Sequence, residues 1–201
     1  MLKIIGGEFR SRQLLSPDDD SVSRPYAGRV KESVFNLLRG WFEGATVLDL
    51  FAGVGTVGLE AVSRGAAKVY MVERNSEVFR LLKRNIEALH CQDRVVAIHA
   101  DALGAAALAR VSGSGPVDLV FVDPPYDLME QATSRQRVLD QIGRCRPLMG
   151  EKGFVILRSP VNTQDAELSI AGFVGPEQHE YGRDMNVLIY APAPSTESDH
   201  V

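Results

Sequence analysis

Cysteine is scarce in this sequence, and long apolar runs are missing from it. The chain has 201 residues and two cysteines, Cys91 and Cys145, whose spacing fits neither a zinc site nor a disulfide framework. No apolar run approaches the roughly 18 residues of a membrane-spanning helix, and the apolar start of the chain is too short for a signal peptide. These absences favour a cytoplasmic globular protein that has no membrane partner and needs no metal.

Negatively charged residues are in only small excess over positively charged ones. The net charge is −4, which argues weakly against a nucleic-acid partner. The distribution is uneven, because residues 1–40 contain seven Lys and Arg against five Asp and Glu. We therefore expect a mildly basic N-terminal segment on an acidic body, and phosphate binding depends on such local clusters rather than on the total charge.

Short apolar runs alternate with amphipathic stretches along most of the chain. Strands are predicted at 46–51, 68–73, 94–99, 117–123 and 153–158, with two more at about 167–174 and 186–191. Helices are predicted at about 28–42, 56–64, 76–90, 102–110 and 134–148. Fully apolar strands that alternate with helices predict an α/β fold, with a mostly parallel seven-stranded sheet covered by helices on both faces.

The two ends of the chain differ from this alternating body. Residues 2–5 and 11–15 flank a pair of glycines and predict an N-terminal β-hairpin. Low apolar content predicts a disordered tail over residues 192–201. We therefore divide the chain into an extension at 1–27, a main domain at 28–191 and this tail.

A glycine-rich loop follows the first strand of the main domain. Gly53, Gly55 and Gly58 form the pattern G-x-G-x-x-G between a strand and a helix. Glu73 ends the second strand, 20 residues after Gly53, where an acid that binds a ribose is expected. The pattern indicates a nucleoside-bearing cofactor, either a nicotinamide dinucleotide or S-adenosylmethionine. The alternative is a tight strand-to-helix turn that binds nothing.

Charge near the loop separates the two cofactors. Asp49 lies in the strand just before the glycines, where it would repel a pyrophosphate but attract the ammonium of S-adenosylmethionine. Its alternative role is to cap the glycine turn. Asp101, after the third strand, can accept a hydrogen bond from the adenine amine, and its alternative role is a helix N-cap. Phe51 and Ala102 adjoin these acids and complete the predicted cofactor site.

The fourth strand ends in Asp-Pro-Pro-Tyr at 123–126. Ligands of such sheets bind beyond the carboxyl ends of the strands, so this motif is expected beside the cofactor. Asp123 and the carbonyl of Pro124 can accept the N–H groups of an exocyclic amine, and Pro125 helps to fix the backbone. Tyr126 offers a flat face for a flipped-out base. The alternative is a turn that only ends the strand.

Together these motifs resemble the class I methyltransferases of Rossmann-like fold, and in particular the RsmD family. The motifs are LDLFAGVGTVGLEAVSRGA, VERN, ADAL and FVDPPY, preceded by the leaders IIGGEFRSRQL and RPYAGRVKESVFNLL. The resemblance covers about residues 2–160. It implies methylation of the N2 amine of a guanine in 16S rRNA, with Gly53, Gly55, Glu73 and Asp101 contacting S-adenosylmethionine and residues 123–126 holding the base.

The partner implied by the resemblance is 16S rRNA, alone, in the small ribosomal subunit or in an assembly intermediate. The candidate RNA contacts are Arg10, Arg12, Arg24, Arg29 and Lys31, and the alternative is a solvated basic surface. The leader departs from the family pattern at two positions. Tyr26 and Gly28 stand where the family commonly has threonine and aspartate, so any contact made by those polar groups is absent or replaced in this chain.

Other functions fit the sequence less well. The target could instead be another RNA, DNA or a protein amide, but glutamine methyltransferases usually have asparagine at the position of Asp123, and DNA adenine enzymes usually carry an added recognition domain. A nicotinamide oxidoreductase conflicts with Asp49 and with the Asp-Pro-Pro-Tyr motif. The last alternative is a cofactor-binding module without catalysis. Unchanged methyl transfer after Asp123→Ala would favour this alternative or a misassigned site.

Overall fold

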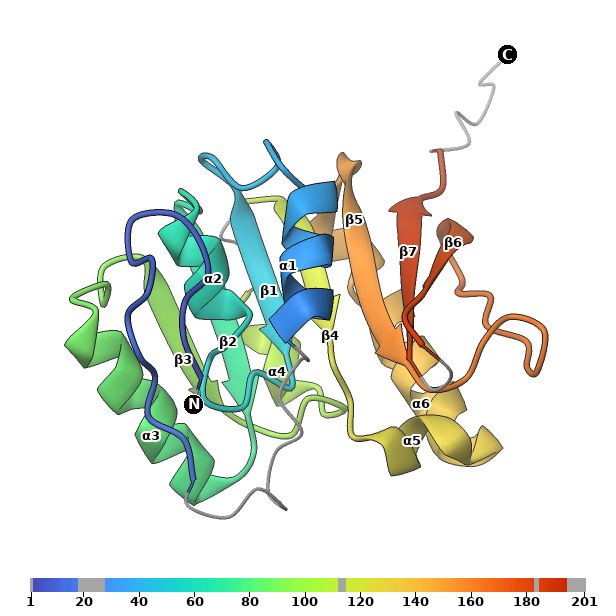
Figure 1. Ribbon diagram of the computed structural model, residues 1–201. Coiled ribbons are helices and arrows are strands. Elements are labelled where there is room, and N and C mark those ends of the chain that lie inside the picture. Colours follow the sequence, from blue (N-terminus) through green and yellow to red (C-terminus); the bar gives the residue numbers. More distant parts are fainter. Residues whose placement is uncertain (1, 18–27, 112–114, 183–184, 195–201) are drawn as a thin grey trace.

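The computed structural model describes residues 2–17, 28–111, 115–182 and 185–194. Within these ranges the chain forms a central sheet with helices on both sides (Figure 1). The strands are β1 (Thr46–Leu50), β2 (Lys68–Glu73), β3 (Val95–His99), β4 (Val117–Val122), β5 (Met149–Ser159), β6 (Phe173–Glu180) and β7 (Asn186–Pro192). The helices are α1 (Gly28–Leu37), α2 (Gly58–Ser63), α3 (Ser76–Ala88), α4 (Ala106–Ala109), α5 (Tyr126–Glu130), α6 (Ala132–Gly143) and the 3₁₀ turn η1 (Arg146–Leu148).

The sheet of the described residues has seven strands, as predicted, and their order is β3-β2-β1-β4-β5-β7-β6. Strands β1 to β5 run parallel, while β7 pairs antiparallel with both β5 and β6. Parallel strands end at a common edge, which lies at the bottom of Figure 1. The residues that follow β1, β2, β3 and β4 therefore converge there, although they are far apart in the sequence.

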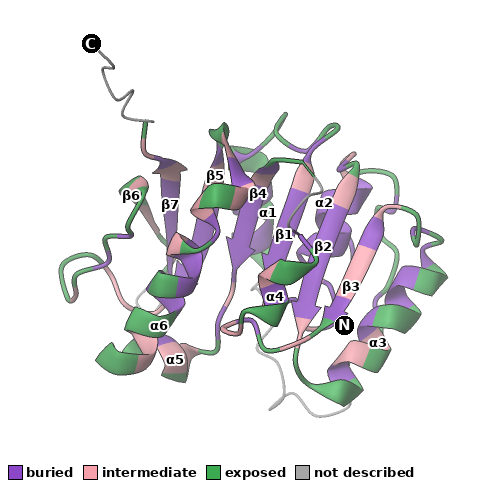
Figure 2. Ribbon diagram, turned by 180° about the vertical axis from the view of Figure 1, so that it is seen from behind, coloured by how far each residue is buried: buried purple, intermediate pink, exposed green. Residues whose placement is uncertain are grey.

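Each face of the sheet has its own buried core (Figure 2). Helices α1, α2 and α3 bury their apolar residues on one face, and α4 and α6 bury theirs on the other. The central strands carry apolar side chains toward both faces and are almost entirely buried. This explains why their sequences are continuous apolar runs rather than alternating ones.

Stacked aromatic rings join α1 to the centre of the sheet. The ring centroids of Phe35 and Phe42 are 4.9 Å apart, and those of Phe35 and Phe121 are 5.6 Å apart. Phe35 and Phe121 are almost completely buried. Phe121 is the β4 partner of Asp49 on β1, so this packing also fixes the two strands that carry the acids of the site.

Several elements differ from the sequence prediction. Residues 167–172 form no strand, and β6 begins at Phe173. Helices α1 and α4 are shorter than predicted, and a separate helix, α5, begins at Tyr126. The N-terminal segments form no named strands, but they pair antiparallel at Lys3 and Gln13 and are joined by backbone hydrogen bonds from Ile4 to Arg12 and from Leu14 to Leu2.

The predicted N-terminal extension and the predicted C-terminal tail are described only in part. Residues 18–27 of the predicted extension and 195–201 of the predicted tail lie outside the described ranges. Among the residues that are described, no helix has the length and apolar character needed to cross a bilayer.

Candidate active site

The glycine loop turns the chain sharply between β1 and α2. Gly53 has φ +57° and Gly55 has φ +93°, in the left-handed region that favours glycine. Phe51 also has a positive φ, +67°, which is uncommon for a bulky residue. The turn is therefore bent tightly at three nearby positions, and it brings the loop back across the carboxyl end of β2.

Two carboxylates bind the backbone of this loop. The N–H of Gly53 donates to Oε2 of Glu73 at 3.0 Å, and the N–H of Gly58 donates to Oδ2 of Asp49 at 2.8 Å. Glu73 accepts a second hydrogen bond, from the N–H of Asn75 at 2.6 Å. These carboxylates already occupy the N–H groups that a phosphate would need, and their negative charge would repel it. This loop therefore suits a ligand with positive charge, amine or hydroxyl groups.

Asp49 is the most deeply buried acid of the site, with 1% of its surface exposed. Burial raises the pKa of its carboxyl well above the usual range, while the hydrogen bond from Gly58 opposes this shift. The negative charges of Asp123 and Glu73 raise the pKa of Asp49 further. Asp123 and Glu73 therefore both lie within electrostatic range of Asp49.

Asp101 and Ala102 follow β3 at the same edge. Asp101 is exposed, and its Oδ1 accepts the N–H of Leu103 at 3.0 Å. Its backbone carbonyl accepts the N–H of Gly104 at 2.9 Å, so this segment is a turn. Helix α4 begins only at Ala106, and Asp101 is therefore not its N-cap. Ala102 is buried.

The Asp-Pro-Pro-Tyr segment connects β4 to α5. Asp123 is partly buried, Pro124 is buried, and Pro125 is the exposed residue that precedes the helix. Tyr126 is the first residue of α5 and is partly buried. Proline at the start of a helix is favourable because its fixed φ suits the turn and its missing N–H is not needed there. The segment therefore presents Asp123 and Tyr126 from a fixed backbone.

Arg158 is a site residue that the sequence analysis missed. It lies at the carboxyl end of β5, with 6% of its side chain exposed, and its Nε forms an ion pair with Oδ1 of Asp123. Its guanidinium carbon is 5.3 Å from the centroid of the Tyr126 ring. An arginine inside the apolar strand GFVILRS is a signal that could have indicated it, because a buried cation requires a partner.

Asp123 therefore experiences two opposing influences. Burial raises the pKa of its carboxyl from 3.8 to about 6, against the attraction of Arg158, which lowers it. Around neutral pH the carboxylate remains largely ionised and acts as a hydrogen-bond acceptor. This is the state that a donor amine needs.

The candidate RNA contacts differ in their surroundings. Arg10, Arg12 and Arg29 are exposed, and Arg12 donates to the carbonyl of Ala88 on α3 at 2.9 Å. Arg24 lies outside the described residues, as does Tyr26. Gly28 is the exposed first residue of α1.

Lys31 contradicts its predicted role as an RNA contact. It is 4% exposed, and its Nζ lies 3.1 Å from Oε2 of Glu60. It also donates to the carbonyls of Lys3 and Thr56. The ammonium therefore joins α1, the N-terminal segment and the glycine loop inside the protein. The helical spacing of apolar residues does not distinguish the buried position of Lys31 from positions on the exposed side of α1.

Buried polar groups attach the N-terminal segment to the domain. Glu60 accepts the N–H groups of Ile5 at 2.8 Å and Gly6 at 2.9 Å, and Asn85 exchanges hydrogen bonds with the backbone of Leu15. Asn85 also donates to the carbonyl of Val54 in the glycine loop at 2.9 Å. Residues 2–15 are therefore packed against α2 and α3, and they also support the predicted cofactor loop.

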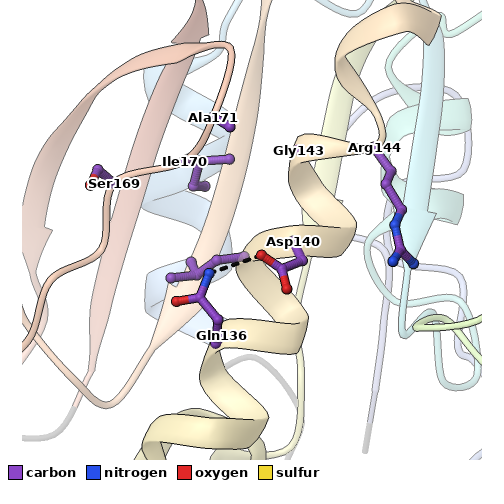
Figure 3. A pocket seen from close by; sticks show the side chains of 8 residues that line it. Gln136, Asp140, Gly143, Arg144, Ser169, Ile170 and Ala171 are labelled. Carbon is purple, nitrogen blue, oxygen red and sulfur yellow. Dashed lines mark hydrogen bonds between the residues drawn. The ribbon is translucent and has the colours of Figure 1, made fainter.

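One pocket lies apart from these residues (Figure 3). It has a volume of about 390 Å³ and lies between α6 and the segment that precedes β6. Gln136 and Asp140 line it from α6, Arg144 lines it from the residue after α6, and Ser169, Ile170 and Ala171 line it from the other side. It contains none of the predicted site residues, so its size does not make it the active site.

Residues 2–190 match the family described as conserved hypothetical protein 95. The chain belongs to this family. The match includes the N-terminal segment, the glycine loop and the Asp-Pro-Pro-Tyr segment, so the family pattern covers all parts of the site.

Several curated relatives carry a functional name, ribosomal RNA small subunit methyltransferase D. The relative from Haemophilus influenzae is 37% identical over 136 residues, which are 66% of this chain and 69% of that protein. The relative from Escherichia coli is 38% identical over 126 residues, which are 62% of this chain and 60% of that protein. The aligned part thus spans about two thirds or less of these proteins, and it confirms the predicted resemblance to the family.

The fold is also shared over nearly the whole chain. A solved structure described as a putative methyltransferase from Escherichia coli matches with a TM-score of 0.75 and 26% identity, covering 95% of this chain and 97% of that one. The chain thus has the fold of the class I methyltransferases, as the strand order and the glycine loop indicate.

Proposed function

We propose that this protein transfers a methyl group from S-adenosylmethionine to the exocyclic N2 amine of a guanine in 16S rRNA. The observation that carries the proposal is the meeting of two groups at one edge of the sheet. One is a glycine loop whose N–H groups donate to the carboxylates of Glu73 and Asp49. The other is Asp123, whose negative charge raises the pKa of Asp49. The names of the curated relatives support small-subunit rRNA as the substrate.

The residues at this edge fit the chemistry of S-adenosylmethionine. Asp49 would favour its ammonium, Glu73 its ribose hydroxyls, and Asp101 its adenine amine, while Phe51 and Ala102 would line the same site. Gly53 leaves open space beside the loop, because a Cβ added there would meet no atom within 4 Å. When bound, this cofactor supplies a methyl group that its sulfonium charge has already activated for transfer.

The protein's own contribution is to hold the target amine. The amine lone pair is delocalised into the guanine ring, so the nitrogen must be turned toward the methyl group. The Asp123 carboxylate would accept one N–H and the Pro124 carbonyl the other, and the proton lost as the N–C bond forms passes to solvent. Tyr126 would stack on the base, which must leave its helix or loop to reach the site.

The N-terminal segment and the start of α1 carry exposed arginines. Arg10, Arg12 and Arg29 would contact phosphates, with Arg24 as a further candidate. We propose that residues 1–27 act as this RNA-contact extension to a methyltransferase domain at 28–191. The substrate would be 16S rRNA, the small ribosomal subunit or an assembly intermediate of it, in the cytoplasm.

A transfer assay with labelled methyl donor tests this function. The protein would be incubated separately with small ribosomal subunits from a strain lacking the corresponding enzyme, with large subunits and with duplex DNA. We expect label only in the RNA of the small subunit. Label confined to large subunits or DNA, or no label in any nucleic acid, would refute the proposed substrate.

A further inference from the structure

Arg158 is a buried cation that directly follows the apolar run 154–157 of β5. Its side chain is 6% exposed, and its neighbours on β5, Ile156 and Leu157, are almost completely buried. Removing a guanidinium from water carries a large cost in free energy unless charged or polar groups compensate for it. An arginine at this position therefore needs an explanation in what it contacts.

Both ends of the Asp-Pro-Pro-Tyr segment are in contact with this one side chain. The Nε of Arg158 donates to Oδ1 of Asp123, and the guanidinium lies over the ring of Tyr126 at 5.3 Å from its centroid. A guanidinium is planar and rigid, so it restricts the rotation of a carboxylate that it binds and the tilt of a ring that it covers. A lysine ammonium would restrict neither to the same degree.

We propose that Arg158 is a positioning residue for amine methylation: by holding Oδ1 of Asp123 it turns Oδ2 toward the target amine, and it fixes the ring of Tyr126 at the angle on which the base stacks. The inference rests on the proposed function, and it assigns to β5 a part in the site that otherwise comes from β1 to β4.

Charge supports the same role. Asp49 on β1 and Glu73 on β2 are further acids of this edge, and Asp123 interacts electrostatically with Asp49. Burial raises the pKa of Asp123, and Arg158 opposes the rise. Without the guanidinium, a larger share of Asp123 would be protonated at neutral pH, and a protonated carboxyl accepts a donor amine poorly.

The geometry makes a specific prediction about an amide at position 123. In Asp123→Asn, the side-chain oxygen would bind Arg158, so the NH₂ group would face the target amine, and two donors would oppose each other. Removing Arg158 as well would free the amide to rotate and present its oxygen. We therefore expect Arg158→Met to impair the wild type but to raise the activity of Asp123→Asn.

The test measures methyl transfer by Arg158→Met, Arg158→Lys, Asp123→Asn and the Arg158→Met/Asp123→Asn double variant. Arg144→Met, at an exposed arginine that directly follows α6, serves as the matched control. For each variant, kcat, the KM for S-adenosylmethionine and the pH profile of kcat would be measured between pH 5 and 8. Thermal unfolding would show which variants are folded.

We expect Arg158→Met to lower kcat about tenfold to a hundredfold at pH 7, as for the loss of a hydrogen bond to a charged group, with little change in KM for the cofactor. The acid limb of its profile should move up by about one pH unit. Arg158→Lys should recover part of kcat, and the double variant should exceed Asp123→Asn. An unchanged acid limb, or a double variant no more active than Asp123→Asn, would overturn the inference.

Failure of the proposed function would look different. If the folded wild type methylated no ribosomal RNA, the substrate would be wrong, and the role of Arg158 would still be measurable by carbon-13 titration of the Asp123 carboxyl. A pKa of Asp123 in Arg158→Met equal to that of the wild type would then refute the role of Arg158, and a pKa raised more in Arg158→Met than in Arg158→Lys would support it.

Discussion

The carboxylate of Asp49 lies beneath the glycine loop and accepts the N–H of Gly58 at 2.8 Å. The approach is close, since a Cβ added to Gly58 would lie 3.1 Å from the same oxygen and 2.4 Å from Sδ of Met71. Asp49 therefore has the capping role that was one of its two alternatives. A carboxylate has several acceptor positions, so the same residue can also face a cation.

Binding of S-adenosylmethionine should depend on pH through Asp49. Burial raises the pKa of this carboxyl, with further increases from Asp123 and Glu73, so the free protein holds a proton there more readily than an exposed aspartate does. A bound cation favours the ionised form and lowers that pKa. The affinity should therefore rise with pH and level off above the pKa of the free protein.

Calorimetric titration between pH 5 and 7 would measure this dependence, in buffers of different ionisation enthalpy so that proton release is counted. Asp49→Asn is the control, and its affinity should vary less with pH than that of the wild type. An affinity that falls as pH rises, or equal slopes in both proteins, would contradict a cationic ligand beside Asp49.

Two glycines of the loop should respond differently to alanine. A Cβ on Gly53 would enter open space, whereas a Cβ on Gly55 would lie 2.7 Å from Cδ1 of Leu82 and 2.9 Å from Cδ1 of Leu59. Gly53→Ala should cost about 1–2 kcal/mol of stability through its positive φ, and it should weaken cofactor binding by about tenfold if about 1.4 kcal/mol is lost. Gly55→Ala has the same backbone strain and should destabilise the fold by about 1–3 kcal/mol more through overpacking. Urea unfolding and cofactor titration of both variants check the contrast, which an equal loss of stability would refute.

Asp123→Ala should affect turnover more than cofactor binding. The proposed contact is mainly to the target amine, so we expect kcat to fall about 10²–10³-fold, comparable to the loss of a preorganised transition-state hydrogen bond. The dissociation constant of S-adenosylmethionine should change only modestly. Parallel losses in both quantities would instead assign Asp123 to the cofactor.

The buried ion cluster of Glu60 should be essential for stability. Its carboxylate contacts Lys31 at 3.1 Å and Arg64 at 2.9 Å and is itself fully buried. Glu60→Gln would leave these cations without their anion and should cost about 3–5 kcal/mol in the free energy of unfolding. Exposed Glu87 on α3 offers the control, since Glu87→Gln should change stability little. Equal urea midpoints for the two variants would refute the importance of the cluster.

Exposed arginines of the N-terminal region should contribute to RNA binding. Arg10→Ala and Arg29→Ala should each weaken affinity for 16S rRNA and reduce the salt slope of the binding constant by about 0.7–0.9, if each residue neutralises one phosphate. Arg137→Ala, at an exposed position of α6, should leave both unchanged. The binding constant would be measured across a salt series. Salt slopes in Arg10→Ala and Arg29→Ala equal to that of the wild type would show that these arginines do not contact the RNA.

Local sequence predicted most of the sheet. β1, β2, β3 and β4 lie within one residue of their predicted bounds, because apolar runs between glycines and charged residues are local signals. The sixth strand was misplaced. Leu168 and Ile170 are buried in alternation and imitate a strand, but the pairing with β7 involves Phe173–Glu180, which includes a glycine and a proline. Strand pairing depends on distant partners, which a local pattern does not contain.

The candidate site was predictable in part for the same reason. Glu73, Asp101 and Asp123 follow strands, so topology alone brings them to one edge. The contacts of Arg158, Glu60 and Asn85 join residues 35, 55 and 70 positions apart, and no spacing rule indicates such pairs. Lys31 was assigned to the wrong environment because its burial depends on how α1 packs.

The identity of the methylated nucleoside tests the central claim most directly. Small ribosomal subunits lacking the modification would be incubated with labelled methyl donor and either the wild type or Asp123→Ala, and the digested rRNA would be analysed by mass spectrometry. The account predicts N2-methylguanosine from the wild type and at least about a hundredfold less from the variant. A methylated adenosine, a label found only in protein, or equal yields from both enzymes would contradict it.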